Sequence, residues 1–367
     1  MVTADKSFQL YACKYISAQL KKLCSQIDGA RIQKEVECVH QSRVASRRMR
    51  VAFEIFQTCF PEKTVNKWEK DIKSLTKGLG TARDVDVQII ALNEIISKLD
   101  AEQRSLKPGI ERLLLRSSQK RNSLQQSVIK AIDKLESRTV LADIHSTVER
   151  TLFCLRNENK QYKSDYLFRT FKKHVSDRAE RLCSFNSCMN DPDDKPAHHQ
   201  MRIEGKKLRY ALEICADAYD GKLDDEFKVV KKIQSLLGDI HDCDVWAERI
   251  DGFMADELQR TREYFGNEVP YYLLLPGLEH LRKYYDGRRR VLFEELSAYW
   301  ARIAEDKVWD KLLGKLNDPL EIAIKARPEI IEIKDTRQTP PYGSNTQNSL
   351  ALRGYPRESA GTEGGGI

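Results

Sequence analysis

Apolar residues recur at spacings of three and four along almost the whole chain up to about residue 315, where proline and glycine are scarce. This period is typical of α-helices that bury one face, so the sequence predicts an all-α fold. In the first half, the pattern predicts helices over residues 5–29, 34–59, 62–77, 81–105 and 109–155, the last either continuous or broken. Beyond about residue 335 the chain is polar, rich in glycine and proline and without periodicity, which is typical of a disordered tail.

One basic helical motif occurs twice. The stretch "HQSRVASRRMR" begins at His40 and "HQMRIEGKKLR" begins at His199. "LGTARDVDV" (79–87) and "PGIERL" (108–113) follow the first copy, and "LGDIHDCDV" (237–245) and "PGLEHL" (276–281) follow the second. Three separated blocks in the same order indicate a tandem duplication. We therefore predict a first repeat over residues 1–157, a second over 158–314 and a mostly disordered C-terminal extension over 315–367, with the repeat boundary near Asn157 to Gln161.

Each copy forms a stripe of positive charge when it is wound as a helix. At about 100° per residue, an arc of about 80° holds most of the basic residues of a copy and one glutamate. These are His40, Arg43, Arg47, Arg50 and Glu54 in the first copy, and His199, Arg202, Lys206, Arg209 and Glu213 in the second. The opposite sides are apolar, with Ala45, Met49, Ala52, Phe53 and Phe56 in the first copy, and Met201, Leu208, Ala211, Leu212 and Cys215 in the second. We expect these backs to pack into the core and fix the stripes outward or into a cleft.

Like charges three or four residues apart on a helix disfavour it by a few tenths of a kcal/mol per pair unless an anion neutralises them. A single charged helix face is commonly solvated surface, but two copies with one spacing favour ligand binding. The candidate anion-binding residues are His40, Arg43, Arg47, Arg48, Arg50, His199, Arg202, Lys206, Lys207 and Arg209. Further basic residues at matched positions form a secondary set: Lys14, Lys22, Arg83, Lys120, Arg121, Lys173, Arg181, His241, Arg288 and Arg289. The matched aspartates Asp84/Asp242 and Asp86/Asp244 are better suited to orient basic side chains than to act as acids.

Composition adds limits to this picture. The chain has 62 basic and 55 acidic residues and a net charge of +7, so the local distribution of charge must carry the argument for an anionic ligand. Its nine cysteines include no C-x-x-C pair, which favours reduced thiols over disulfides or a zinc site. No stretch approaches 18 uncharged apolar residues and the first residues lack a signal-peptide pattern, so we expect an intracellular protein with no membrane partner.

The paired motifs resemble the CHAD family, the conserved histidine α-helical domain, over roughly residues 5–312. The resemblance implies two tandem four-helix bundles, related by a pseudo-two-fold axis, whose basic helices face a central cleft or pore that binds inorganic polyphosphate. It also implies a non-catalytic module of the cytoplasm, without a cofactor, that associates with polyphosphate granules and their proteins. The E-x-E-x-K signature of the catalytic domain often fused to this family is absent, since "EVECVH" has the glutamates without the lysine. The first copy departs from the second by having Arg83 where the second has His241.

The residue types suit this ligand. Polyphosphate carries about one negative charge per phosphate and has no base edge to read, while arginine offers planar donor forks and lysine a mobile point charge. A histidine would add a donor that strengthens when it is protonated beside phosphate.

Two other functions stay open at this stage. His199, His241 and Asp242, with Asp244 or Asp251, could form the metal set of a helical phosphohydrolase, although the first copy has Arg83, which cannot ligate a metal. Basic stripes also attract nucleic acid. Tyr210 is the one aromatic residue in the stripes, so stacking on bases is poorly provided for and nucleic acid is the less favoured ligand.

Overall fold

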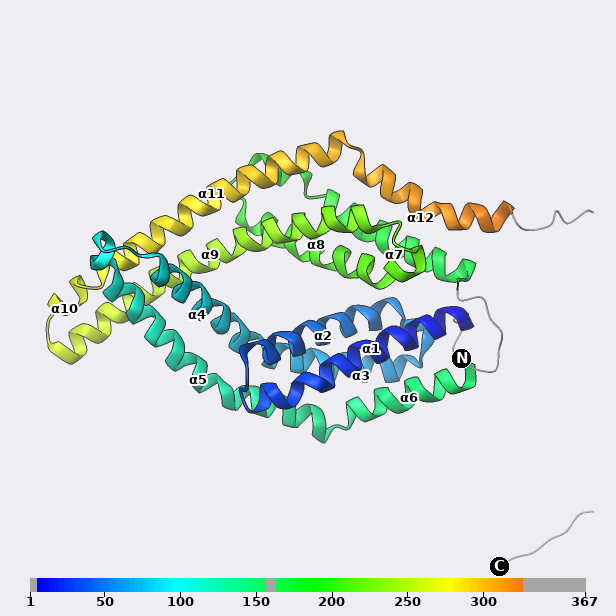
Figure 1. Ribbon diagram of the computed structural model, residues 1–367, viewed down its shortest axis with the longest axis horizontal. Coiled ribbons are helices and arrows are strands. Elements are labelled where there is room, and N and C mark those ends of the chain that lie inside the picture. Colours follow the sequence, from blue (N-terminus) through cyan, green and yellow to red (C-terminus); the bar gives the residue numbers. More distant parts are fainter. Residues whose placement is uncertain (1–4, 156–162, 326–367) are drawn as a thin grey trace, which may run out of the picture. The chain divides into compact units, whose positions relative to one another are not determined.

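The computed structural model describes residues 5–155 and 163–325. Over these residues the fold is all-α and contains no strand, as the apolar period predicts (Figure 1). The described residues form one compact unit, to which both predicted repeats contribute. The predicted tail and the predicted repeat boundary near residues 157–161 lie outside the described residues.

The first half folds as six α-helices with two short 3-10 turns between them. These are α1 (Lys6–Arg31), α2 (Val36–Ile55), η1 (Gln57–Cys59), α3 (Glu62–Gly78), α4 (Gly80–Lys98), η2 (Glu102–Leu106), α5 (Lys107–Ser137) and α6 (Val140–Leu155). The helix expected over residues 109–155 is broken, because Thr139 has a φ of 53°. A β-branched residue with positive φ cannot continue a right-handed helix, so the chain turns there.

The second half contains α7 (Asp165–Cys183), η3 (Asn186–Asn190), α8 (Lys195–Cys215), η4 (Ala216–Tyr219), α9 (Asp224–Phe265), α10 (Val269–Tyr272), α11 (Leu275–Glu305) and α12 (Val308–Lys325). Helix α9 is continuous where the first half changes from α3 to α4. At that change a Cβ on Gly78 would lie 2.4 Å from the Cβ of Ala131, whereas the matched residue of α9 is Leu236. The predicted boundary at residue 314 falls inside α12. The order of the helices fits a duplication, which itself stays a prediction.

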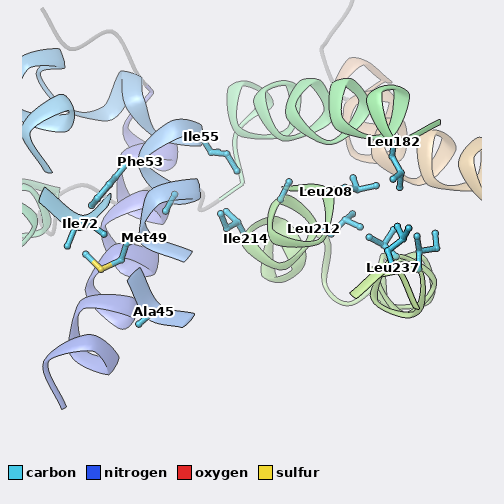
Figure 2. Close-up of a cluster of buried hydrophobic side chains, with 14 of the residues drawn as sticks. Ala45, Met49, Phe53, Ile55, Ile72, Leu182, Leu208, Leu212, Ile214 and Leu237 are labelled. Carbon is cyan, nitrogen blue, oxygen red and sulfur yellow. The ribbon is translucent and has the colours of Figure 1, made fainter. Parts of the chain in front are cut away.

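The apolar backs of the two basic helices are buried, as predicted. All ten residues assigned to them are 2% exposed or less. Met49 of α2 points toward Ile72 of α3, and Leu208 of α8 lies near Leu182 of α7 and Leu237 of α9 (Figure 2). Burial of these side chains fixes the rotation of α2 and α8, and therefore the direction in which their stripes face.

Several contacts join the halves, and two regions of contact lie outside the basic stripes. The first is aromatic: the rings of Phe8 and Phe171 lie 5.9 Å apart, and the Tyr11 hydroxyl donates a hydrogen bond of 2.5 Å to the carbonyl of Ile214. The second is a helix crossing between the first turns of α5 and α11. A Cβ on Gly109 would lie 2.1 Å from the Leu274 carbonyl oxygen, and one on Gly277 would lie 2.0 Å from the Leu106 carbonyl oxygen. The glycine of each Pro-Gly motif therefore permits this close approach.

Candidate anion-binding site

The two basic helices contact each other and run in the same direction (Figure 1). Near their starts, Arg43 of α2 is close enough to Arg202 of α8 to lower the pKa of that guanidinium, after the larger effects of burial and neighbouring charges. Near their ends, Arg48 of α2 forms an ion pair of 2.5 Å with Glu213 of α8. The stripes are therefore aligned, with their histidines at one end and their glutamates at the other.

All ten residues of the primary predicted set are half-buried. They are His40, Arg43, Arg47, Arg48, Arg50, His199, Arg202, Lys206, Lys207 and Arg209. The Nε–H groups of five of these arginines are buried and have no hydrogen-bond partner: those of Arg47, Arg48, Arg50, Arg202 and Arg209. A buried donor without an acceptor is unfavourable by about 1–3 kcal/mol. The stripes are therefore unlike a solvated helix face, where water would satisfy each donor.

The centre of the aligned stripes has a surplus of positive charge. Burial, and then the positive charges of Arg202 and Arg47, lower the pKa of Lys206 to about 7 against an opposing effect of Asp242. The pKa of Arg47 is also lowered, first by burial, and Arg43 contributes as a neighbouring cation. Lowered pKa values of bases mean that their charged forms are unfavourable here. An anion placed among them would reverse this effect.

The histidine end contains a pair of imidazoles. The Nδ1 atoms of His199 and His241 are 3.2 Å apart. Burial, and then the positive charge of Arg202, lower the pKa of His241 to about 4. The pKa of His40 is lowered by burial and then by Arg83. His40 and His241 are therefore mostly neutral near pH 7 in the protein without an anion, and the predicted protonation beside phosphate would have to accompany binding.

The glutamate end is held by ion pairs that join the halves. Glu213 contacts Arg48, as described above, and lies 3.8 Å from Arg209 on its own helix. Glu54 of α2 pairs with Arg178 of α7 at 2.9 Å. Sequence reasoning missed Arg178, which is buried. Its matched residue in the first half is Gln19, so the repeat held no signal for it.

Gly80 makes room for one arginine of the stripe. The Nη1 group of Arg43 donates a hydrogen bond of 3.1 Å to the carbonyl of Thr76, at the end of α3. A Cβ on Gly80 would lie 2.6 Å from that same nitrogen. The turn between α3 and α4 therefore orients Arg43, which gives the glycine of the "LGTARDVDV" block a place in the site.

The secondary predicted set separates into three groups. Arg121 and Arg289 are buried, and the Nε of each donates a hydrogen bond of 2.6 Å to an aspartate, Asp86 and Asp244 respectively. These bonds confirm the predicted orienting role of Asp86 and Asp244. Because the guanidinium groups of Arg121 and Arg289 are already paired, the site proposed below does not include these two arginines. Arg83 and His241 are half-buried beside the stripes. The remaining six are exposed, and their part in binding stays a prediction: Lys14, Lys22, Lys120, Lys173, Arg181 and Arg288.

A cavity of about 940 Å³ lies between α2, α3 and α8. It is lined by four residues of the stripes and by Tyr210, whose ring lies 4.5 Å from the guanidinium carbon of Arg209 and 5.9 Å from that of Arg47. Because cations already contact this ring and Tyr210 is only 5% exposed, it offers no free face for stacking on a base. Glu54, Glu62, Glu69 and several apolar side chains also line the cavity, so only the wall with Arg47, Arg50, Lys206 and Lys207 suits an anionic ligand.

The alternative metal site has less support. Within residues 5–155 and 163–325, no group of three or more histidine, cysteine, aspartate or glutamate side chains is placed to hold a metal ion. His199 and His241 are adjacent, as the alternative requires, but Asp244 accepts hydrogen bonds or ion pairs from Arg289 and Lys195. All nine cysteines are free thiols. No helix among the described residues is long and apolar enough to cross a membrane.

Comparison with known proteins identifies the family and agrees with the all-α fold. The family model of the CHAD domain matches residues 14–251. The crystal structure of the CHAD domain from the plant Ricinus communis matches with a TM-score of 0.56 at 20% identity, over 80% of this chain and 90% of that one. PptA from Streptomyces chartreusis matches with a TM-score of 0.48 at 15% identity, over 78% of this chain and 97% of that one. A search of curated proteins gives no match. The chain belongs to the CHAD domain family.

Proposed function

We propose that this chain binds inorganic polyphosphate along both stripes at once, without cleaving it. The observation that carries the proposal is the central cluster of Arg47, Arg202 and Lys206, whose positive charges are half-buried, close together and without enough acidic partners. This arrangement destabilises the charged form of Lys206, and solubility alone would not require it. A polyanion supplies the missing negative charge.

The ligand should be linear and longer than a single phosphate. From His40 to Arg50 the stripe of α2 spans about 15 Å at 1.5 Å per residue, and that of α8 runs beside it. A flexible chain of phosphates can contact successive cations of both rows, and each added contact is intramolecular once the first has formed. The arginine forks and the lysine recognise phosphate oxygens and require no base or sugar.

The scarcity of aromatic residues in the stripes favours polyphosphate over nucleic acid as the ligand. Single-stranded nucleic acid gains about 1–3 kcal/mol for each base that stacks on an aromatic ring. Tyr210 is the one aromatic residue of the stripes, and two arginines already contact its ring. Binding to polyphosphate would also bring the protein to cytoplasmic polyphosphate granules and their proteins, which we include in the proposal.

The test is a set of titrations at one fixed salt concentration, with long-chain polyphosphate, tripolyphosphate and single-stranded DNA whose total charge matches the long chain. We expect the long chain to bind tightest, and tripolyphosphate to bind about 100-fold more weakly per mole because it cannot contact both ends of the stripes. Equal affinity for the matched DNA would indicate a general polyanion site instead. Equal affinity for tripolyphosphate would indicate one small phosphate pocket, and the two-stripe proposal would be wrong.

A further inference from the structure

The turn between α9 and α11 exposes an unusual number of large apolar side chains. Five lie within residues 264–273, and their exposed fractions are 83% for Tyr264, 54% for Phe265, 69% for Val269, 56% for Tyr272 and 69% for Leu273. This turn, which includes α10, lies at the end of the α9–α11 hairpin (Figure 1). We call these five residues the apolar tip. The rings of Tyr264 and Phe265 are in contact, and a soluble monomer rarely exposes large apolar side chains in such number within ten residues unless a partner covers them.

The backbone beneath the apolar tip is held in one conformation by polar contacts. Gly266 ends α9 with a φ of 67°, a left-handed conformation that favours glycine. Glu268 then accepts a hydrogen bond of 2.6 Å from Arg262 and one of 3.0 Å from the Tyr272 hydroxyl. The apolar side chains are therefore presented on an ordered support, which lowers the entropy lost when a partner binds.

A hollow of about 590 Å³ adjoins the apolar tip and is lined partly by Tyr264 and Phe265. Its other lining residues are Arg112, Arg116, Arg260, Thr261 and Glu263, and the first two of these arginines pair with the buried Glu257. A protruding apolar surface beside a hollow with mixed charges can complement a second copy of itself across a two-fold axis, since each copy offers both features. An anionic lipid surface would instead favour a large surplus of positive charge. Here Glu257 pairs with Arg112 and Arg116, and Glu268 pairs with Arg262, so most of the arginines around the tip are already neutralised.

We propose that the apolar tip docks against the apolar tip of a second copy of this chain and forms a two-fold dimer. At their exposed fractions, the three aromatic rings carry on the order of 400 Å² of accessible surface. With Val269 and Leu273 the tip approaches the roughly 800 Å² per partner of a standard protein interface. The surface is therefore large enough for a reversible dimer, and the proposal does not depend on the function proposed above.

The experiment compares three forms of the full chain by size-exclusion chromatography with light scattering, in buffers without polyphosphate so that no shared ligand bridges two copies. The forms are the wild type, Val269→Asp with Leu273→Asp, and the control Val291→Asp. Val291 is 64% exposed on α11, away from the tip. We expect the wild type and the control to change from monomer to dimer between about 1 and 100 µM, and the double variant to stay monomeric. Circular dichroism should show the same helix content in all three.

Three results would overturn the proposal. The first is a wild type that stays monomeric up to about 100 µM, the upper end expected for an interface of this size. The second is a double variant that dimerises as the wild type does, since the contact would then lie elsewhere. The third is a monomeric wild type that sediments with phosphatidylserine vesicles while the double variant does not, because the tip would then contact lipid.

Discussion

Affinity for polyphosphate should fall as the pH rises above 7, because Lys206 loses its proton. Burial, Arg202 and Arg47 lower the pKa of Lys206 to about 7 in the free protein. A bound polyanion favours the charged amine and raises this pKa toward its ordinary value. Below about pH 7 the amine is protonated both before and after binding, so the affinity is at its full value. Above that pH, binding must first recover a proton, and the affinity declines.

The magnitude follows from the difference between the two pKa values. If the anion restores the ordinary pKa of about 10.4, the binding constant falls about tenfold for each pH unit above 7, and it is about 100-fold weaker at pH 9 than at pH 6. If the anion raises the pKa of Lys206 by less than this, the binding constant falls by a smaller factor. His241 has a pKa near 4 in the free protein, so it adds to the decrease only if the anion raises its pKa into the same range.

The assay is calorimetric titration with long-chain polyphosphate, whose terminal groups are few, in two buffers of different ionisation enthalpy. Near pH 8 the wild type should take up close to one proton per site. Lys206→Arg keeps the charge and removes the titration, so its affinity should be nearly constant over this range and any residual slope reports the histidines. A wild-type affinity that is flat from about pH 6 to about pH 9, with no proton uptake, would refute this reasoning.

Two other predictions concern stability. Gly109→Ala and Gly277→Ala should each destabilise the fold, because the new Cβ would lie 2.1 Å and 2.0 Å, respectively, from a carbonyl oxygen. The control is Gly252→Ala, whose Cβ would have no atom within 4 Å and which should stabilise the helix by about 0.5–1 kcal/mol. Urea unfolding measures all three, and equal effects would contradict the close crossing. Arg121→Met should cost about 3–5 kcal/mol in the same assay, because it leaves the buried carboxylate of Asp86 unpaired, and restored stability in Arg121→Met with Asp86→Leu would confirm that cause.

Much of the fold could be predicted because helix formation and burial follow the local apolar period. The rotation of α2 and α8 came from that period, and Met49 and Leu208 are buried as expected. The breaks were less predictable. Whether a Gly-containing segment ends a helix depends on its contacts: Gly78, close to Ala131, ends α3, whereas the matched Leu236 lies inside the continuous α9.

The repeat made the positions of the basic residues predictable. It did not predict which of their side chains are paired, because that depends on tertiary contacts. The repeat located all ten residues of the primary predicted set, which are half-buried. It could not distinguish Arg121, which a buried aspartate pairs, from the adjacent Lys120, which is exposed. It was also silent on Arg178 and on the ion pair of Arg48 with Glu213, since these contacts form only when the two halves pack together.

The central claim is tested most directly by the affinity of Arg47→Glu with Lys206→Glu for long-chain polyphosphate. The control is Lys130→Glu with Lys311→Glu, which changes the net charge equally at two exposed positions on α5 and α12. Circular dichroism melts should show both double variants folded, unlike Met49→Asp, which places a charge in the core. We predict that the stripe variant loses binding while the control keeps most of it. A folded stripe variant that binds like the wild type would contradict the account.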